Sequence, residues 1–286
     1  MTQRGALVLF DIDGTLVSPN GAGSRALLAA GSALFGDAFT VDGLDPSGKL
    51  DPAIFLELAE RHPHLDLRSR AADFLPLYLA ALEREAHRMR ALPGAAATVA
   101  RLAGEPGVTL GILTGNYASV ATLKLETTGL VRPGRVEPFS VRACGDEAAD
   151  RAALVPLART RYLASRGVTQ APSMLLVGDT PRDVEAGRAH DVPAVGVATG
   201  RWCAEALTQA GAAQTPKATW AATSACTSAV PSRVPRTPSP PSTPPTAPPW
   251  PRCPSRGPLR STPPLPRPAP RSTTGGACRR WSARAG

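Results

Sequence analysis

The chain has 286 residues and a formal net charge of +9, but residues 213–286 contribute 11 Lys or Arg and no acid, which leaves 21 basic against 23 acidic side chains in residues 1–212. The basic balance therefore comes from the C-terminal segment, and the composition of residues 1–212 does not favour nucleic acid as a partner. No apolar run approaches the ~18 residues of a membrane span, no secretory leader precedes Asp11 and the five cysteines lack metal-site spacing, so we expect a cytoplasmic protein without a membrane segment.

The first predicted strand, residues 6–10, runs directly into two carboxylates and a glycine. A continuous apolar run that ends in a turn signal is typical of a buried strand in a parallel sheet. Asp11 and Asp13 are two residues apart, so on an extended chain they point to the same side. Gly14 permits a tight turn and the close approach of a ligand. Because two like charges at this spacing repel unless a cation lies beside them, the pair predicts a metal site.

The next stretch, residues 17–91, has a mainly helical pattern. Apolar residues recur at helical spacing in residues 24–35, 52–61 and 71–89, and no alternating strand pattern interrupts them. This pattern predicts a helical insertion placed directly after the first strand.

From residue 92 onward, apolar strands alternate with helices. We expect helices over residues 95–102, 117–127, 151–166 and 184–190, and strands over residues 108–113, 138–142, 173–177 and 193–198. This alternation predicts an α/β fold with a doubly wound parallel sheet, which binds its ligands at the carboxyl ends of the strands. The strand over residues 108–113 ends in Thr114, and the strand over residues 173–177 is followed by Asp179.

Four elements of the chain, taken together, resemble the motifs of one known family. The sequence DIDGTL, residues 11–16, resembles the first motif of the haloacid dehalogenase-like (HAD) hydrolase superfamily. Thr114 resembles its second motif, Arg151 its third, and Asp179 with Asp183 its fourth, in the family's order. The resemblance is greatest to the phosphoglycolate phosphatase-like branch. It implies a Rossmann-like core domain (residues 1–16 and 92–212) with a helical cap (residues 17–91).

The resemblance also implies a phosphatase that acts on a small phosphorylated metabolite. Asp11 would be the nucleophile and form an aspartyl-phosphate. Asp13 would protonate the leaving alkoxide and then activate water. Mg²⁺ would be held by Asp11, Asp179 and the backbone carbonyl of Asp13, while Asp183 orients the metal's waters or a ligand.

The remaining implied site residues would contact the substrate. Thr114, Arg151 and the backbone amides after Thr114 would stabilise charge on the phosphoryl oxygens, and Gly14 lets the substrate approach. The group comprises Gly14, Thr114, Gly115, Asn116, Arg151 and, from a loop with the sequence GKLD, Lys49.

Several of these interpretations compete with a simpler one. Arg151 begins a predicted amphipathic helix, where an arginine is commonly just exposed to solvent. Lys49 is likewise compatible with a solvent-exposed lysine that has no role in the site. Lys124, in the middle of a predicted helix, is expected on the surface. Asp13 separates the chain from dehalogenases and phosphonatases, which lack this second acid. Phosphoglucomutases keep both acids, so a phosphoglucomutase-like phosphotransferase stays open.

Residues 213–286 are rich in Pro, Arg, Ser and Thr and lack apolar periodicity, so we expect a disordered tail. The aliphatic run of a further strand, which the family places after Gly211, is missing. The abrupt loss of acids is what a GC-rich coding sequence read in a shifted frame would produce. An alternative to the phosphatase is therefore an inactive product whose basic tail binds nucleic acid or a proline-reading domain. The sequence does not predict an oligomeric state.

Overall fold

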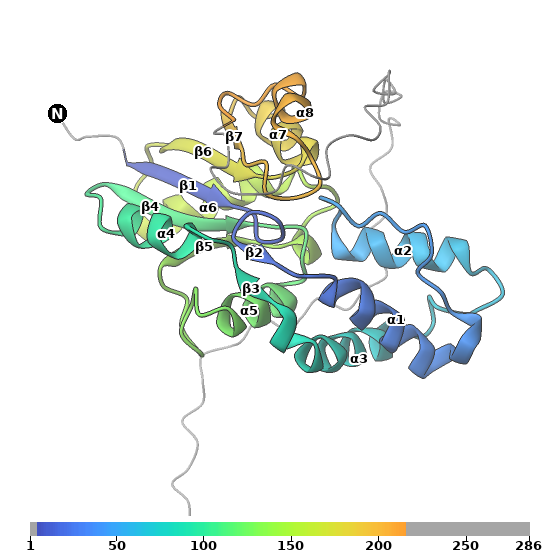
Figure 1. Cartoon of the computed structure of the whole chain (residues 1–286). Helices are drawn as coiled ribbons and strands as arrows, with labels where there is room; N and C mark the ends of the chain where they lie inside the picture. The colour runs from blue at the N-terminus through green and yellow to red at the C-terminus, as the bar shows by residue number, and fades with distance from the viewer. Residues whose placement is uncertain (1–4, 216–286) are drawn as a thin grey trace, which may run out of the picture. The chain divides into compact units, whose positions relative to one another are not determined.

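A parallel five-stranded sheet organises residues 5–215, the part of the chain that the computed structural model describes. The strand order is β5-β4-β1-β6-β7, with β1 (Ala6–Phe10) in the middle (Figure 1). Its neighbours are β4 (Val108–Leu113) and β6 (Ser173–Gly178), and the outer strands are β5 (Phe139–Ala143) and β7 (Ala194–Gly196). Every strand pair within this sheet is parallel, which confirms the predicted α/β class and all five predicted strands of the sheet.

Alternate residues of the central strand pack against different helices. Val8 and Phe10 belong to an apolar cluster that includes residues of α4 (Ala95–Ala103) and α5 (Ala118–Thr127). Leu7 and Leu9 belong to a second cluster, with residues of α6 (Leu154–Arg166) and α7 (Pro181–Arg188). Since successive side chains of a strand point to opposite faces, the sheet is covered by helices on both sides, as a doubly wound fold requires.

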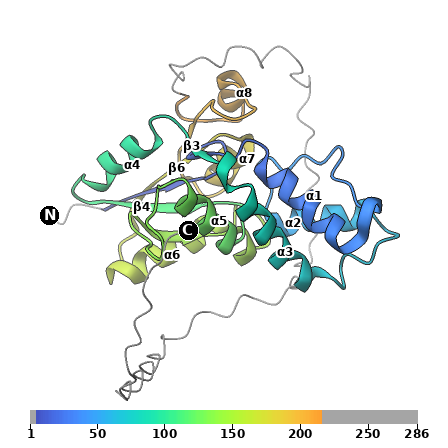
Figure 2. The same cartoon turned by 60° about the horizontal axis from the view of Figure 1, so that its bottom comes forward.

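The helical insertion contains α1 (Ala22–Phe35), α2 (Asp51–Arg61) and α3 (Ala71–Arg84). Helices α1 and α3 pack side by side and lie to one side of the sheet in Figures 1 and 2. The third helix ends five residues before its predicted end at residue 89, and a 3-10 turn follows at Ala86–Arg88. That the insertion forms a separate cap domain stays a prediction.

Two short strands, which the sequence analysis missed, join the ends of this insertion. β2 (Val17–Ser18) pairs in antiparallel fashion with β3 (Arg90–Ala91). A strand of two residues is too short to show a period, so no sequence pattern could have revealed it. The pairing brings the two crossings between sheet and insertion next to each other.

The chain continues to pair with the sheet after α8 (Ala204–Gln209). The backbone N–H of Ala213 donates to the carbonyl of Ala194, and the N–H of Gly196 donates to the carbonyl of Gln214, each at 2.8 Å. Residues 213–215 thus occupy the outer edge of β7, although they lack the aliphatic run of an ordinary strand. The rest of the expected tail, residues 216–286, lies outside the described residues. No helix within residues 5–215 is long and apolar enough to cross a membrane.

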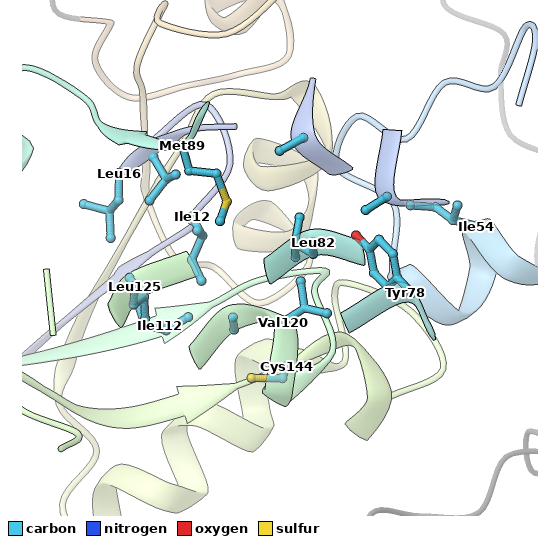
Figure 3. Close-up of a cluster of buried hydrophobic side chains, with 14 of the residues drawn as sticks. Ile12, Leu16, Ile54, Tyr78, Leu82, Met89, Ile112, Val120, Leu125 and Cys144 are labelled. Atoms are coloured by element: carbon cyan, nitrogen blue, oxygen red, sulfur yellow. The ribbon is translucent and has the colours of Figure 1, made fainter. Parts of the chain in front are cut away.

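Apolar packing beneath the end of β1 holds the acidic turn in place. Ile12 is fully buried between the two acids and lies near Leu16, Ile112 and Leu125 (Figure 3). Because Ile12 points into this cluster, its neighbours in the chain are directed the other way. The core therefore determines where the two carboxylates face.

Candidate active site

The order of the strands brings the predicted motifs to one place. β4, β1 and β6 are adjacent and parallel, so their carboxyl ends lie at the same edge of the sheet. Asp11 and Asp13 follow β1, Thr114 follows β4 and Asp179 follows β6. All four line one cavity of about 310 Å³, which is at the small end of ligand sites and suits a small molecule.

A cluster of buried carboxylates lies at this edge. Asp11, Asp179 and Asp183 each place a carboxylate oxygen within 4.8 Å of the others. Burial raises the pKa of Asp11 to about 6, although the nearby Arg151 guanidinium opposes the shift. Burial and then the Asp11 charge raise the pKa of Asp179 well above its ordinary value. When ionised, three carboxylates against one guanidinium leave two negative charges, so the cluster can hold a divalent cation.

Asp183 supports this cluster from behind. Its Oδ2 accepts hydrogen bonds from the backbone N–H of Thr180 at 3.0 Å and from the Thr180 hydroxyl at 2.7 Å. Its Oδ1 accepts from Arg151. Asp183 is fully buried and is absent from the cavity wall, whereas Asp11 and Asp179 line it. The geometry therefore suits Asp11 and Asp179 as direct ligands and Asp183 as an orienting residue.

Two glycines leave the room that the Asp179 carboxylate occupies. A Cβ atom would lie 2.2 Å from Asp179 Oδ2 at Gly14 and 1.9 Å from it at Gly200. Gly14 also has a φ of +76°, which side chains rarely adopt. Gly14 is predicted to let a ligand approach the backbone closely. The structure adds a second reason for a glycine here, because any side chain would collide with Asp179, a predicted metal ligand.

Arg151 is buried, in contrast to a solvated arginine at a helix start. The predicted helix over residues 151–166 begins at Leu154, and residues 151–153 form a tight turn in which the N–H of Leu154 donates to the carbonyl of Arg151 at 3.2 Å. From this turn the Arg151 side chain reaches inward and is 7% exposed. Its Nη2 lies 3.0 Å from Asp11 Oδ1 and also bonds Asp183.

The turn after β4 lies against the insertion. Thr114 is 1% exposed, and its hydroxyl accepts a long hydrogen bond of 3.4 Å from the N–H of Asn116. At Gly115 a Cβ atom would lie 2.1 Å from the carbonyl oxygen of Lys49, so only glycine fits. The Gly115 carbonyl accepts from the N–H of Asp51 at 2.7 Å. The GKLD loop therefore contacts the turn that carries the predicted phosphoryl-binding groups.

Within that loop, Lys49 and Asp51 differ in their surroundings. Lys49 lines the cavity, but its ammonium pairs with Glu57. Asp51 also lines the cavity, and its carboxylate accepts from the N–H of Tyr117 at 2.8 Å. Burial raises the pKa of Asp51 to about 7. The role of Lys49 as a substrate contact stays a prediction, and no feature of the sequence indicated that the Asp51 carboxyl is buried.

Lys124 is not on the surface, and that expectation is wrong. The side chain is 3% exposed, and its Nζ lies 2.5 Å from Asp13 Oδ2 and 3.0 Å from Asn116 Oδ1. Lys124 follows the buried Val120 by four residues and the buried Ala121 by three, so all three side chains lie on the buried face of the helix. A lysine on the buried face of a helix indicates a partner inside the protein, because an unpaired ammonium is costly to bury.

A scan against protein-family models matches residues 8–188 to the haloacid dehalogenase-like hydrolases. A search of curated proteins gives no match.

Solved structures with the same fold include several proteins of low sequence identity. A hydrolase from Pseudomonas syringae has a TM-score of 0.56 and 21% identity, covering 74% of this chain and 93% of that protein. CbbY from Rhodobacter sphaeroides, in complex with phosphate, has a TM-score of 0.56 and 19% identity, covering 75% and 94%. A predicted phosphoglycolate phosphatase from Haemophilus somnus 129pt has a TM-score of 0.51 and 16% identity, also covering 75% and 94%.

These structural matches show the fold of the chain. The family match covers more than half of the chain, including the turns that carry Asp11, Thr114 and Asp179. The chain belongs to the haloacid dehalogenase-like hydrolase family.

Proposed function

We propose that the protein is a Mg²⁺-dependent phosphatase that hydrolyses a small phosphomonoester through an aspartyl-phosphate on Asp11. The observation that carries the proposal is that Asp11 and Asp179 face one small cavity beside a buried guanidinium, with a second acid, Asp13, two residues after the first. A carboxylate can attack an anionic phosphoryl group only where positive charge offsets the repulsion. Arg151 supplies one such charge, and the divalent cation that the carboxylates can hold would supply the rest.

Mg²⁺ suits this donor set because it prefers hard oxygen ligands and needs few from the protein. Asp11, Asp179 and the Asp13 backbone carbonyl would hold the ion, with Asp183 orienting its surroundings. When bound, the ion would neutralise charge on the phosphoryl oxygens and on the attacking carboxylate.

The two acids after β1 divide the chemistry between them. In the first half-reaction, an Asp11 oxygen bonds to phosphorus, the ester P–O bond breaks and a proton on Asp13 moves to the departing alkoxide. In the second, water bonds to phosphorus and gives its proton to Asp13, while the P–O bond to Asp11 breaks and phosphate leaves. Asp13 is thus restored to its starting state.

Thr114 and the amides of Gly115 and Asn116 lie where they can stabilise the phosphoryl oxygens, because all three residues line the cavity beside Arg151. The substrate is proposed to be a small phosphorylated metabolite, in keeping with the cavity of about 310 Å³. The CbbY structures with phosphate and, for a mutant of that protein, with xylulose-(1,5)bisphosphate agree with this class of ligand.

The test is hydrolysis of p-nitrophenyl phosphate by the purified full-length chain with and without Mg²⁺. The proposal predicts Mg²⁺-dependent phosphate release that Asp11→Asn abolishes, with unfolding temperatures of the two proteins within a few degrees. Metal-independent release, or full activity in Asp11→Asn, would contradict it. Analysis of the products from a sugar phosphate separates hydrolysis from the phosphoryl transfer of a mutase, since only hydrolysis releases inorganic phosphate.

A further inference from the structure

Lys124 stands on a rigid part of the molecule. It belongs to the buried face of α5, together with Val120, Ala121 and Leu125. Figure 3 shows Val120 and Leu125 within the apolar cluster that also contains Ile112 of β4. These neighbours fix the helix against the sheet, and the Lys124 side chain is buried beside them, with 3% of its surface exposed.

The ammonium group belongs to a small hydrogen-bonded triangle. Lys124 Nζ donates to Asp13 Oδ2 at 2.5 Å and to Asn116 Oδ1 at 3.0 Å, and Asn116 Nδ2 donates to the same Asp13 Oδ2 at 3.1 Å. Each of the three side chains is bonded to both of the others. Asn116 therefore orients the lysine and the carboxylate at the same time.

The two oxygens of the Asp13 carboxylate consequently have different surroundings. Oδ2 receives two donors, whereas Oδ1 is buried and has no hydrogen-bond partner among the described residues. Asp13 also lines the cavity and its side chain is 31% exposed, so the carboxyl group can exchange a proton with a bound substrate or water.

We propose that Lys124 is a positioning residue for the general acid and base Asp13, whose carboxylate it holds in place through Oδ2 for both proton transfers. This inference rests on the proposed phosphatase function. The same carboxyl group gives its proton to the departing alkoxide and takes one from water, and it must keep its orientation through both steps. A carboxylate free to rotate would present either oxygen and would often miss the required geometry.

A purely structural ion pair is the competing explanation. Replacing a buried ion pair by apolar residues of similar volume is often neutral or stabilising, so stability alone gives little reason to place a lysine between Val120, Ala121 and Leu125. The two explanations differ in what the loss of Lys124 does to the chemistry. If the pair is only structural, loss of Lys124 should lower kcat/KM by the same factor for all substrates. If Lys124 positions Asp13, the loss should be largest for substrates whose leaving group most needs a proton.

The test compares p-nitrophenyl phosphate with phenyl phosphate in wild type, Lys124→Met and Asp13→Asn. The two substrates are of similar shape, but p-nitrophenolate is a stable anion and phenolate needs a proton more as it leaves. The ratio kcat/KM reports the steps up to departure of the phenol, where Asp13 acts as an acid. Lys124→Met is expected to lose on the order of 10-fold on p-nitrophenyl phosphate and on the order of 100-fold on phenyl phosphate.

A double-mutant cycle gives a second, independent measurement. If Lys124 acts through Asp13, Lys124→Met should cost less than about 3-fold when Asp13 is already Asn, because the carboxylate that it positions is gone. Arg101→Met, which removes an exposed cation from α4, is the control and should leave both substrates unaffected. If Lys124→Met does not fold cooperatively, Lys124→Gln, which keeps a polar group at the site, takes its place in both measurements.

An equal loss on both substrates, or full additivity with Asp13→Asn, would overturn the positioning role. Failure of the wild-type protein to hydrolyse either ester in Mg²⁺ would instead overturn the proposed function. Failure of the inference can therefore be told apart from failure of the function on which it rests.

Discussion

Arg151 Nη2 lies 3.0 Å from Asp11 Oδ1, and the same nitrogen bonds Asp183. One buried guanidinium thus joins the predicted nucleophile to the residue that supports the proposed metal site. This contact is available only because Arg151 lies in the turn before α6 and not on an exposed helical face.

Arg151→Met should lower both stability and activity, because it leaves Asp11 and Asp183 without their shared cation. We expect a loss of about 3 kcal/mol in the free energy of unfolding and a fall in kcat on the order of 100-fold or more. Arg151→Lys keeps the charge and should retain more of both. Urea unfolding and steady-state kinetics measure the two effects, and equal behaviour of the Met and Lys variants would contradict this account.

Gly200→Ala should weaken Mg²⁺ binding, because the new methyl group would lie 1.9 Å from Asp179 Oδ2 and push this predicted ligand away. The Mg²⁺ concentration for half-maximal activity should rise on the order of 10-fold. Gly104→Ala is the matched control, since the nearest atom to its Cβ is 3.5 Å away. An unchanged Mg²⁺ requirement in Gly200→Ala would argue against Asp179 as a ligand.

Glu57→Gln tests whether Lys49 can contact the substrate. The substitution releases the Lys49 ammonium from its ion pair at the cavity wall. For phosphate esters with a second anionic group, KM should then fall roughly 2- to 5-fold, because a free cation attracts the anion more strongly. KM for p-nitrophenyl phosphate, which has no second anion, serves as the internal reference. If both values move together, Lys49 does not contact the leaving group.

Asp51→Asn should change stability in a pH-dependent way. Burial raises the pKa of Asp51 from 3.8 in the unfolded chain to about 7 in the folded protein. Between these values the folded protein binds a proton that the unfolded chain lacks, so this group makes the wild type less stable as the pH rises from 3.8 to about 7. Asparagine stays neutral and still accepts from the N–H of Tyr117.

The Asp51→Asn variant should therefore be more stable than wild type at about pH 8, on the order of 1 kcal/mol or more, and nearly equal to it at about pH 4. Urea unfolding at the two pH values measures the difference. A stability change of the same size at both would show that the Asp51 carboxyl does not titrate in this range.

Much of this architecture could be predicted because apolar strands that end in polar turns are strong local signals. The turns at Asp11, Thr114 and Asp179 each follow such a strand, and parallel pairing of those strands alone brings them to one edge. The sequence pattern predicts a start of α6 at Arg151, because amphipathic spacing does not distinguish the tight turn of residues 151–153 from the first turn of an α-helix.

Other features depend on contacts between distant parts of the chain. Lys124 looks like a surface residue until its neighbours Val120 and Ala121 are known to face the core. Gln214 pairs with β7 through backbone hydrogen bonds, which any residue type can form and which the side-chain composition therefore does not predict. Tertiary contacts of this kind cannot be obtained from local periodicity.

The central claim is that the phosphoryl group is transferred to Asp11, and trapping the intermediate tests it most directly. Wild type and Asp11→Asn are mixed with substrate and Mg²⁺, quenched in acid within the first turnover and analysed by peptide mass spectrometry. We expect the mass of one phosphoryl group on the peptide that contains Asp11, sensitive to hydroxylamine and absent from Asp11→Asn. A phosphorylated peptide elsewhere in the chain, or rapid turnover in which no phosphoenzyme forms at any quench time, would contradict the account.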